Sequence, residues 1–337
     1  MLFNAHIILK SLYITQQGCE ISLKKETLII RHQQNILSKV QIPLIEQILI
    51  FGSSQITTQA IRACIWQNIP IVYLSRMGYC YGRILPLERG YRQLSRYQQQ
   101  LTRGEKLTVA REIITGKLKN SRVLLRRYQR KQPSSLIAQT LLELSHLLIK
   151  IEQVKDIKQL VGLEGAGAAS YFSVYGEVIN NSNFVFVARS RRPPGNPVNA
   201  MLSFGYQILW NHLLSLIELQ ELDPYQACLH QGNYRHAALA SDLIEEFRAP
   251  IVDSLVLYLI NRRLVDSDTD FIYRNGGCYL NDAGRKKYLQ AFLQRMEAEI
   301  KTDVGKQPRW DLLMQQVKLY KQFVYQPVHL YRPYLIR

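Results

Sequence analysis

The first 85 or so residues carry short runs in which apolar and polar positions alternate, as they do in half-buried β-strands. Such runs cover residues 20–23 and 28–30, on either side of a polar turn at 24–26, and an apolar run of strand length follows at 42–51. Residues 71–74 and 79–85 flank a hairpin turn at 75–78. Between 57 and 67 the apolar residues fall on one helical face instead. This pattern predicts a small β-sheet domain with one short helix.

Beyond Pro86 and Gly90, apolar residues recur three and four positions apart, the spacing of amphipathic helices. The expected fold class is therefore α+β and multidomain, with an N-terminal β-domain at residues 1–88, a linker at 89–98 and a C-terminal all-helical domain at 99–337. The expected helices run over about residues 92–103, 105–130, 134–157, 165–180, 197–220, 238–262, 282–301 and 309–323.

The balance of charged residues indicates what kind of partner the protein binds. Forty-three Lys and Arg against 26 Asp and Glu leave a net charge of +17, which indicates an anionic partner. Residues 91–131 hold twelve basic and two acidic side chains, a net of +10, with tyrosines interleaved. A solvated helical face does not require charges of one sign, so we favour a DNA backbone as the partner of this segment. A membrane surface is the weaker alternative, because the apolar residues here are needed for the core.

No stretch approaches the roughly 20 apolar residues that span a bilayer, and the first ten residues lack the features of a signal peptide. The five cysteines are scattered, odd in number and never in a CxxC pair. A disulfide framework or a zinc knuckle is therefore not expected. We expect small core residues instead, in a protein of the reducing cytoplasm.

A run of small residues at 162–172, GLEGAGAASYF, allows another backbone to approach closely. Its one carboxylate, Glu164, is expected near a helix start, where a negative charge is favourable. Taken alone, the run predicts a tight helix crossing.

Further along, His230 precedes a loop, and the helix that follows carries Asp242 and Glu245 three residues apart on one face. Two like charges in this arrangement are unfavourable unless a cation or a basic side chain lies between them. A carboxylate at the edge of the core beside an imidazole suits a divalent metal. Two structural alternatives stay open: His230 as a satisfied core histidine, and a salt bridge from the carboxylates to Arg248.

Cutting or joining a phosphodiester requires charge neutralisation on the phosphoryl oxygens and a positioned oxygen nucleophile. Carboxylate oxygens bind Mg²⁺ or Mn²⁺, and one imidazole biases a site toward Mn²⁺. In this hypothesis Glu164, His230 and Glu245 are the metal ligands, while Asp242 is an auxiliary catalytic residue that orients a ligand or accepts a proton. Spacing alone does not decide between this hypothesis and the structural alternatives.

Residues 188–199, ARSRRPPGNPVN, hold three prolines that prevent a regular helix through the middle of the segment. Guanidinium groups match phosphate oxygens in pairs, so we expect this loop to hold a DNA backbone; the alternative is an exposed basic connector. The expected DNA contacts are six arginines, of which two lie in the basic segment, three in this loop and one in the helix that carries Glu245: Arg122, Arg126, Arg189, Arg191, Arg192 and Arg248.

Four strings resemble, in this order, the CRISPR-associated protein one family, the integrase of spacer acquisition: GLEGAGAASYF, RSRRPPGNPVNAMLSFGYQIL, LDPYQACLH and ALASDLIEEFRAPIVDSLVLYLINRR. The likeness spans about residues 155–290, and the first 85 residues also look like that family's N-terminal domain. It places the family's metal-binding glutamate on Glu164, its histidine on His230, its last acidic ligand on Glu245 and the companion aspartate on Asp242. The sequence departs from the family at 235–237, where Arg-His-Ala replaces the usual Gly and small residue or Pro.

The resemblance implies a Mg²⁺- or Mn²⁺-dependent DNA endonuclease and integrase of CRISPR adaptation, an antiviral defence. This enzyme inserts short foreign duplexes into the CRISPR array by 3′-hydroxyl attack on a phosphodiester. The resemblance also implies double-stranded DNA as substrate, a homodimer held by the β-domain, and a dimer of the small CRISPR-associated protein two as partner. Two other functions stay open: a basic DNA-binding scaffold, and a stand-alone DNA repair or transposon-type nuclease without CRISPR partners.

Overall fold

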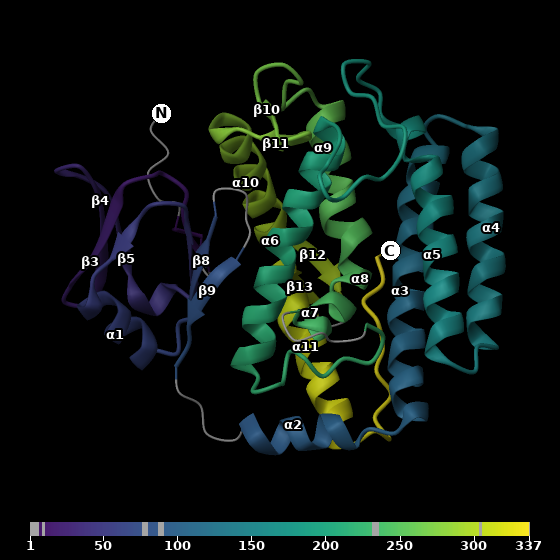
Figure 1. Ribbon diagram of the computed structural model, residues 1–337, viewed down its shortest axis with the longest axis horizontal. Coiled ribbons are helices and arrows are strands. Elements are labelled where there is room, and N and C mark those ends of the chain that lie inside the picture. Colours follow the sequence, from purple (N-terminus) through teal and green to yellow (C-terminus); the bar gives the residue numbers. More distant parts are fainter. Residues whose placement is uncertain are drawn as a thin grey trace. The chain divides into compact units, whose positions relative to one another are not determined.

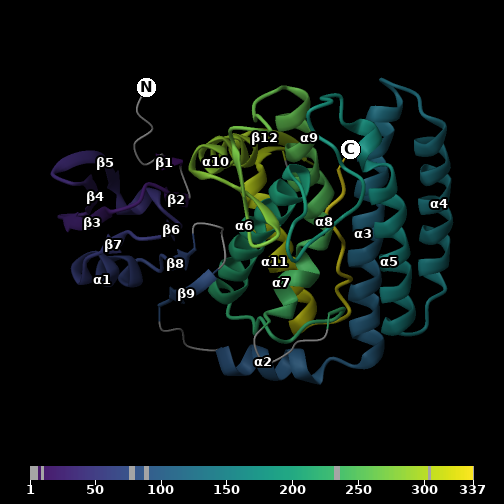
Figure 2. The same ribbon diagram turned by 45° about the horizontal axis from the view of Figure 1, so that its top comes forward.

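The computed structural model describes residues 7–8, 11–75, 80–86, 91–230, 236–302 and 305–336. The chain divides into two compact units, Met1–Arg89 and Gly90–Arg337. The first unit is built mainly of strands and the second mainly of helices (Figures 1 and 2). The expected fold class is therefore confirmed.

The N-terminal unit consists of two sheets and one helix. The five-stranded sheet has the order β1-β2-β6-β8-β9, and the four-stranded sheet has the order β5-β4-β3-β7. The strands are β1 (Ile7–Ile8), β2 (Ser11–Ile14), β3 (Cys19–Lys24), β4 (Thr27–His32), β5 (Asn35–Gln41), β6 (Gln47–Phe51), β7 (Gln55–Ile56), β8 (Ile71–Leu74) and β9 (Cys80–Ile84). Helix α1 (Thr58–Trp66) begins after Thr57, whose side chain accepts the N–H of Ala60. Both sheets and α1 contribute buried apolar residues to one core.

Several local expectations for this unit hold. Strands β3 and β4 pair antiparallel around the polar turn, in which Lys25 takes a φ of 55°. Strands β8 and β9 also pair antiparallel, although most of the turn expected at 75–78 lies outside the described residues. The prediction of a single strand over residues 42–51 is wrong, because only Gln47–Phe51 forms a strand. The first part of this run is a 3₁₀ turn, Ile42–Leu44, because Pro43 has no N–H to give to a strand ladder.

The second unit contains ten helices in its described part. They are α2 (Tyr91–Gln100), α3 (Arg103–Gln129), α4 (Ser135–Glu152), α5 (Ile157–Ser173), α6 (Pro197–Leu219), α7 (Ala238–Leu243), α8 (Glu245–Phe247), α9 (Ser254–Asn261), α10 (Asp282–Glu297) and α11 (Arg309–Tyr325). Helices α3, α4 and α5 lie side by side (Figures 1 and 2). Two small hairpins, β10 (Phe271–Arg274) with β11 (Gly277–Leu280) and β12 (Glu299–Thr302) with β13 (Gly305–Pro308), were not expected from the sequence.

The helix boundaries correct three expectations. Most of the linker expected at 89–98 is helical, because α2 buries Leu94 and Gln98 on one face. The chain turns between α4 and α5, where Asp156 caps the N-terminus of α5; Glu164 therefore lies within a helix and not near its start. The helix expected at 238–262 is divided by a π-helical turn, Arg248–Asp253, around Pro250, which cannot donate a backbone hydrogen bond.

All five cysteines are free thiols, and only Cys80 is not fully buried, as expected of small core residues. None of the helices in the described part of the chain is both long and apolar enough to cross a membrane.

Candidate active site

One turn of α3 brings two carboxylate-bearing helices together. A Cβ at Gly167 of α5 would lie 2.5 Å from Cδ2 of Leu118, so α5 packs directly on α3 at this point. A Cβ at Gly116 would lie 3.4 Å from Cβ of Glu246 in α8. Lys117 stands between these two contacts. The small-residue run thus makes the tight crossing expected from the sequence.

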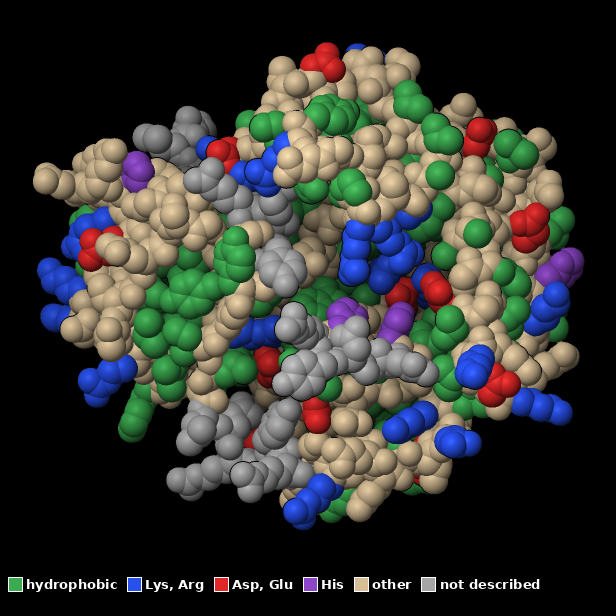
Figure 3. Space-filling model, in the orientation of Figure 1, with side chains coloured by type: hydrophobic (Ala, Val, Ile, Leu, Met, Phe, Trp, Pro, Cys, Tyr) green, Lys and Arg blue, Asp and Glu red, His purple; other side chains and the backbone are tan. Residues whose placement is uncertain are grey.

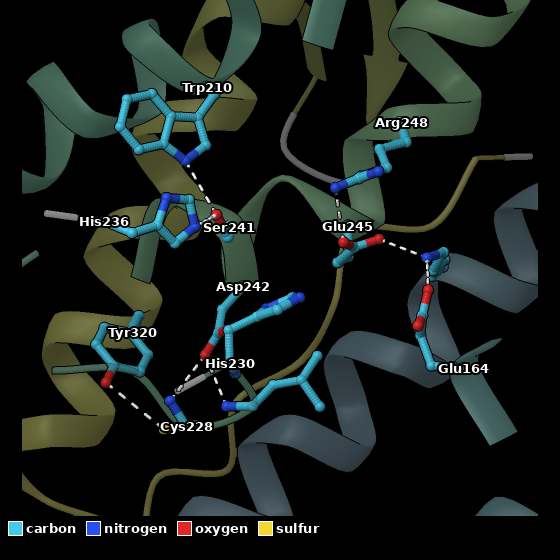
Figure 4. A network of polar contacts seen from close by, with 12 residues as sticks. Glu164, Trp210, Cys228, His230, His236, Ser241, Asp242, Glu245, Arg248 and Tyr320 are labelled. Atoms are coloured by element: carbon cyan, nitrogen blue, oxygen red, sulfur yellow. Dashed lines mark hydrogen bonds and ion pairs between the residues drawn. The ribbon is translucent and has the colours of Figure 1, made fainter. Parts of the chain in front are cut away.

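The side chain of Lys117 joins two of the expected metal ligands. Its Nζ contacts Oε1 of Glu164 and lies 2.7 Å from Oε2 of Glu245, and Figure 4 shows both carboxylates turned toward this point. Lys117 is 8% exposed and Glu245 3% exposed, so water screens the contact little. The strongly basic segment had suggested that its cations face DNA, but Lys117 is buried against acidic groups instead.

Glu245 also meets a second cation. Nη2 of Arg248 lies 2.9 Å from its Oε1, which is the salt bridge that the sequence left open as an alternative. Burial by itself would raise the pKa of Glu245, but the charges of Arg248 and Lys117 outweigh it and hold that pKa well below its usual range. Glu245 is therefore ionised. Its Oε2 is buried and accepts no hydrogen bond of ordinary geometry, so its contact with Lys117 is ionic.

Asp242 fixes the segment that ends at His230. It is fully buried, and its carboxylate accepts the backbone N–H groups of Cys228, Leu229 and His230 at 2.7, 2.9 and 2.9 Å. The same carboxylate lies 2.8 Å from Nδ1 of His230 (Figure 4). Because Nδ1 faces Asp242, Nε2 is the ring nitrogen on the opposite side and the one suited to a ligand.

The half-buried ring of His230 holds its proton more tightly than an isolated imidazole. Burial lowers its pKa, but the hydrogen bond and charge of Asp242, together with the charge of Glu245, outweigh this effect and raise it. The influence of Glu245 places the two side chains within electrostatic reach of each other. Because an imidazolium cannot ligate a metal, metal binding at His230 would compete with its protonation.

His236 belongs to a separate cluster. Its ring stacks on Trp210 with centroids 5.9 Å apart, and its Nε2 lies 2.8 Å from Oγ of Ser241 (Figure 4). The family resemblance places the ligand histidine on His230 and not on His236. The rest of the loop that departs from the family pattern, at 231–235, lies outside the described residues.

The acidic and imidazole groups form two neighbouring pairs. Glu164 and Glu245 share Lys117, while Asp242 and His230 face each other. Across the part of the chain that the structure describes, no three His, Cys, Asp or Glu residues lie close enough together to hold a metal ion. In this conformation the ammonium of Lys117 provides the positive charge between the two glutamates.

The arginines expected to bind DNA fall into two groups. Arg189 and Arg248 are held by the protein, since their guanidinium carbons lie 5.6 and 4.8 Å from the centre of the Tyr206 ring. Arg189 also donates to Asn199 and Ser203. The other four are exposed or half-buried: Arg122, Arg126, Arg191 and Arg192. Figure 3 shows Lys and Arg side chains gathered beside histidine and acidic side chains on this unit.

Sequence reasoning missed Asp253. It is buried in the turn before α9, where its carboxylate accepts the hydroxyl of Tyr171 at 3.0 Å and that of Tyr206. Its backbone oxygen accepts the hydroxyl of Tyr175 at 2.8 Å. Asp253 therefore ties α5 and α6 to the segment that follows Asp242 and Glu245 in the chain. The available signal was one acidic residue within the apolar stretch IVDSLVLYL.

Comparison with known proteins now identifies the family. The family profile described as CRISPR associated protein Cas1 matches residues 12–294. The chain belongs to the Cas1 family. A CRISPR-associated endonuclease Cas1 from Moorella thermoacetica is 34% identical over 306 residues, which cover 88% of each chain. The family and the enzyme class expected from the sequence are thereby confirmed, since Cas1 relatives carry the name endonuclease.

Solved structures share the Cas1 fold. A chain of a Cas6-RT-Cas1–Cas2 complex superposes with a TM-score of 0.81 at 23% identity, covering 99% of this chain and 36% of that longer chain. A casposase bound to its integration product superposes with a TM-score of 0.80 at 22% identity, covering 94% of this chain and 91% of that one. At these identities the likeness is one of fold.

Proposed function

We propose that this Cas1 protein is a Mg²⁺- or Mn²⁺-dependent DNA endonuclease and integrase that inserts short foreign duplexes into a CRISPR array. One observation carries the proposal. Two carboxylates from different helices, Glu164 and Glu245, converge on a single cationic group beside a histidine that Asp242 orients. This arrangement lies in a unit that supplies most of the chain's excess positive charge.

The donor set fits a divalent metal. Two carboxylates and one imidazole are the ligands that Mg²⁺ and Mn²⁺ accept, and the two carboxylates already share one positive charge. Glu164, His230 and Glu245 would hold the ion, His230 through Nε2. When bound, the metal would neutralise charge on the phosphoryl oxygens and favour an oxygen nucleophile. Asp242 would orient His230 without being a ligand itself.

The protein's own groups would position the reacting strands. Arg191 and Arg192 in the Pro-rich loop, with Arg122 and Arg126 on α3, would contact phosphates, and Arg189 and Arg248 would line the approach from the Tyr206 side. In strand transfer, a 3′-hydroxyl oxygen bonds to phosphorus and the bond to the leaving 3′-oxygen breaks. The nucleophile gives up one proton and the leaving oxygen takes one. Hydrolysis is the same reaction with water as nucleophile.

The proposed partners are double-stranded DNA, a second copy of the chain through the N-terminal unit, and a dimer of the small Cas2 protein. Support comes from membership in the Cas1 family and from the shared fold with a chain of a Cas6-RT-Cas1–Cas2 complex. A reducing cytoplasm is the proposed location, in keeping with five free thiols.

The test is integration of a short duplex into a supercoiled plasmid that carries CRISPR repeats. We expect joined products with Mn²⁺ or Mg²⁺, at repeat boundaries when Cas2 is present, and none in EDTA. A donor with 3′-dideoxy ends is the matched control, because it binds equally well but has no attacking hydroxyl.

Products that persist in EDTA, or that form from the dideoxy donor, would remove the proposed mechanism. Efficient, site-independent joining that Cas2 does not alter would favour a stand-alone transposon-type enzyme, the second candidate, which the shared fold with a casposase supports.

A further inference from the structure

A cavity of about 460 Å³ lies in the helical unit, away from the carboxylates described above. It is formed by the C-terminal end of α3, the turn around Pro250 with α9, the last turns of α10 and the start of α11. Arg127, on α3, is ten residues beyond Lys117, which corresponds to ~15 Å along a helix axis. The cavity is therefore distinct from the proposed metal site.

The charged side chains that line this cavity are all positive. Four cationic side chains contribute to it and no acidic residue does: Arg127, Lys131, Arg295 and Arg309. Arg295 donates to Ser254 and lies 5.8 Å from the centre of the Tyr258 ring. Burial, followed by the charge of Arg309, lowers the pKa of Arg295 to about 10. Cations that disfavour one another in a partly buried site are stabilised by an anion.

The cavity also offers an aromatic surface. The rings of Tyr128 and Tyr258 both contribute to the lining, and Tyr258 is 45% exposed. A lone phosphate would leave most of the space empty, whereas about 300–1,000 Å³ is the usual size of sites for small organic ligands. Four cations around one cavity suit a terminal phosphate of charge about −2 better than the single charge of each DNA backbone phosphate.

We propose that this cavity binds a nucleoside phosphate, with the phosphate among its four cationic side chains and the base against Tyr258. This site is independent of the metal site and of the proposed strand-transfer reaction. The same phosphate chemistry could reach the cavity from a free nucleotide or from a DNA strand, and the structure favours the free nucleotide for the reasons of charge and shape given above.

Calorimetric titration of the full chain in EDTA tests this proposal without a contribution from bound metal. The ligands are AMP, ATP, inorganic phosphate and a single-stranded decamer without terminal phosphates. We expect nucleotide binding that is at least 10-fold tighter than phosphate binding. The double substitution Arg127→Gln and Lys131→Gln should weaken it at least 10-fold, while Tyr258→Ala should weaken nucleotide binding and leave phosphate binding unchanged.

Arg130→Gln is the matched control, because Arg130 is exposed at the same end of α3 but does not line the cavity. Loss of nucleotide binding in this variant equal to that in the double variant would overturn the proposal. So would the absence of nucleotide binding at millimolar concentration. Binding of the decamer alone, sensitive to Arg127 and Lys131, would assign the cavity to DNA and also overturn it.

A second inference comes from Lys117 and rests on the proposed metal site. Its ammonium contacts carboxylates that would otherwise repel each other in a buried position. We infer that Lys117 is a positioning residue that holds Glu164 and Glu245 together in the metal-free protein and competes with the metal for them. Removing its charge while keeping its length should therefore favour the metal.

Lys117→Met should bind Mn²⁺ at least 10-fold more tightly than wild type in titration calorimetry without DNA. In EDTA, the melting temperature of Lys117→Met should be lower than that of wild type. Added Mn²⁺ should raise the melting temperature of this variant more than it raises that of wild type. Lys119→Met is the matched control, because it removes the same charge from an exposed position two residues away. Equal affinities of the two variants would overturn the role of Lys117 and leave the metal site standing. No Mn²⁺ binding by any variant would overturn the metal site as well.

Discussion

His230→Ala is expected to abolish DNA cleavage and strand transfer, lowering both rates by at least ~10²-fold, while DNA affinity stays within about a factor of two. The reason is that different residues are expected to serve catalysis and DNA binding. Asp242 holds the imidazole within electrostatic reach of Glu245, whereas affinity for DNA is expected to come mainly from cationic contacts with phosphates. Single-turnover cleavage and equilibrium binding, measured on the same branched duplex, separate the two quantities.

His236→Ala is the matched control for this experiment. It removes a second imidazole six residues away, but from the cluster with Trp210 and Ser241. We expect its cleavage rate to remain within a few-fold of wild type. If His230→Ala lost binding and cleavage in equal proportion, the chain would be better described as a DNA-binding scaffold whose acidic cluster is structural.

The second large effect concerns the pH dependence of stability. Glu246 is fully buried next to Glu245, and its carboxyl group is contacted by the hydroxyl of Tyr331 and the backbone N–H of Tyr334. Burial raises its pKa to about 8, against the smaller opposing effect of these hydrogen bonds. The folded protein therefore keeps a proton on Glu246 that the unfolded chain releases near pH 4.5.

The sign of the effect follows from this difference. A pKa raised in the folded state stabilises the protein fully below the unfolded value, and this contribution is lost as pH rises through about 8. The free energy of unfolding should fall by roughly 3–5 kcal/mol over this range because of Glu246. In Glu246→Gln, whose side chain is neutral at every pH, this loss should be absent.

Urea denaturation from pH 5 to 8.5 measures this difference. Trp66→Phe provides a suitable background, because it leaves Trp210 and Trp310, both in the helical unit, as the fluorescent reporters. The stability of Glu246→Gln relative to the background should increase with pH and level off above pH 8. Glu152→Gln, at an exposed position, serves as the control. Its free energy of unfolding should change with pH in the same way as that of the background protein. A Glu246→Gln curve that also runs parallel would contradict the assignment of a buried, protonated Glu246.

Much of the fold could be predicted from the sequence. Period-two and period-3.6 patterns identified a sheet-rich unit followed by a helical one, and the β3–β4 hairpin followed from alternation around a polar turn. Errors arose where one residue overrode the pattern. Pro43 turned the start of a strand into a 3₁₀ turn, and Pro250 divided one expected helix.

The site was predicted less completely. The four strings singled out Glu164, His230, Asp242 and Glu245, and the structure brings these residues into two neighbouring pairs. Lys117 could not be recognised as their partner, because it is one of twelve basic residues in the segment 91–131 and nothing in the sequence pattern separates it from the others. Its burial follows from the packing of its two neighbours, Gly116 and Leu118, against other segments and from its contacts with Glu164 and Glu245. Side-chain direction of this kind depends on tertiary contacts, which periodicity does not report.

The glycine contacts on either side of Lys117 have a consequence for how the chain tolerates change. A Cβ at Gly167 of α5 would lie 2.5 Å from the side chain of Leu118 in α3, and a Cβ at Gly116 of α3 would lie 2.6 Å from Pro333 near the C-terminus. A methyl group at Gly167 would require the buried side chain of Leu118 to shift, which changes the packing beside Lys117 without altering either glutamate. The size of the side chain at these two interior positions is therefore closely limited, although both lie outside the set of charged and imidazole groups.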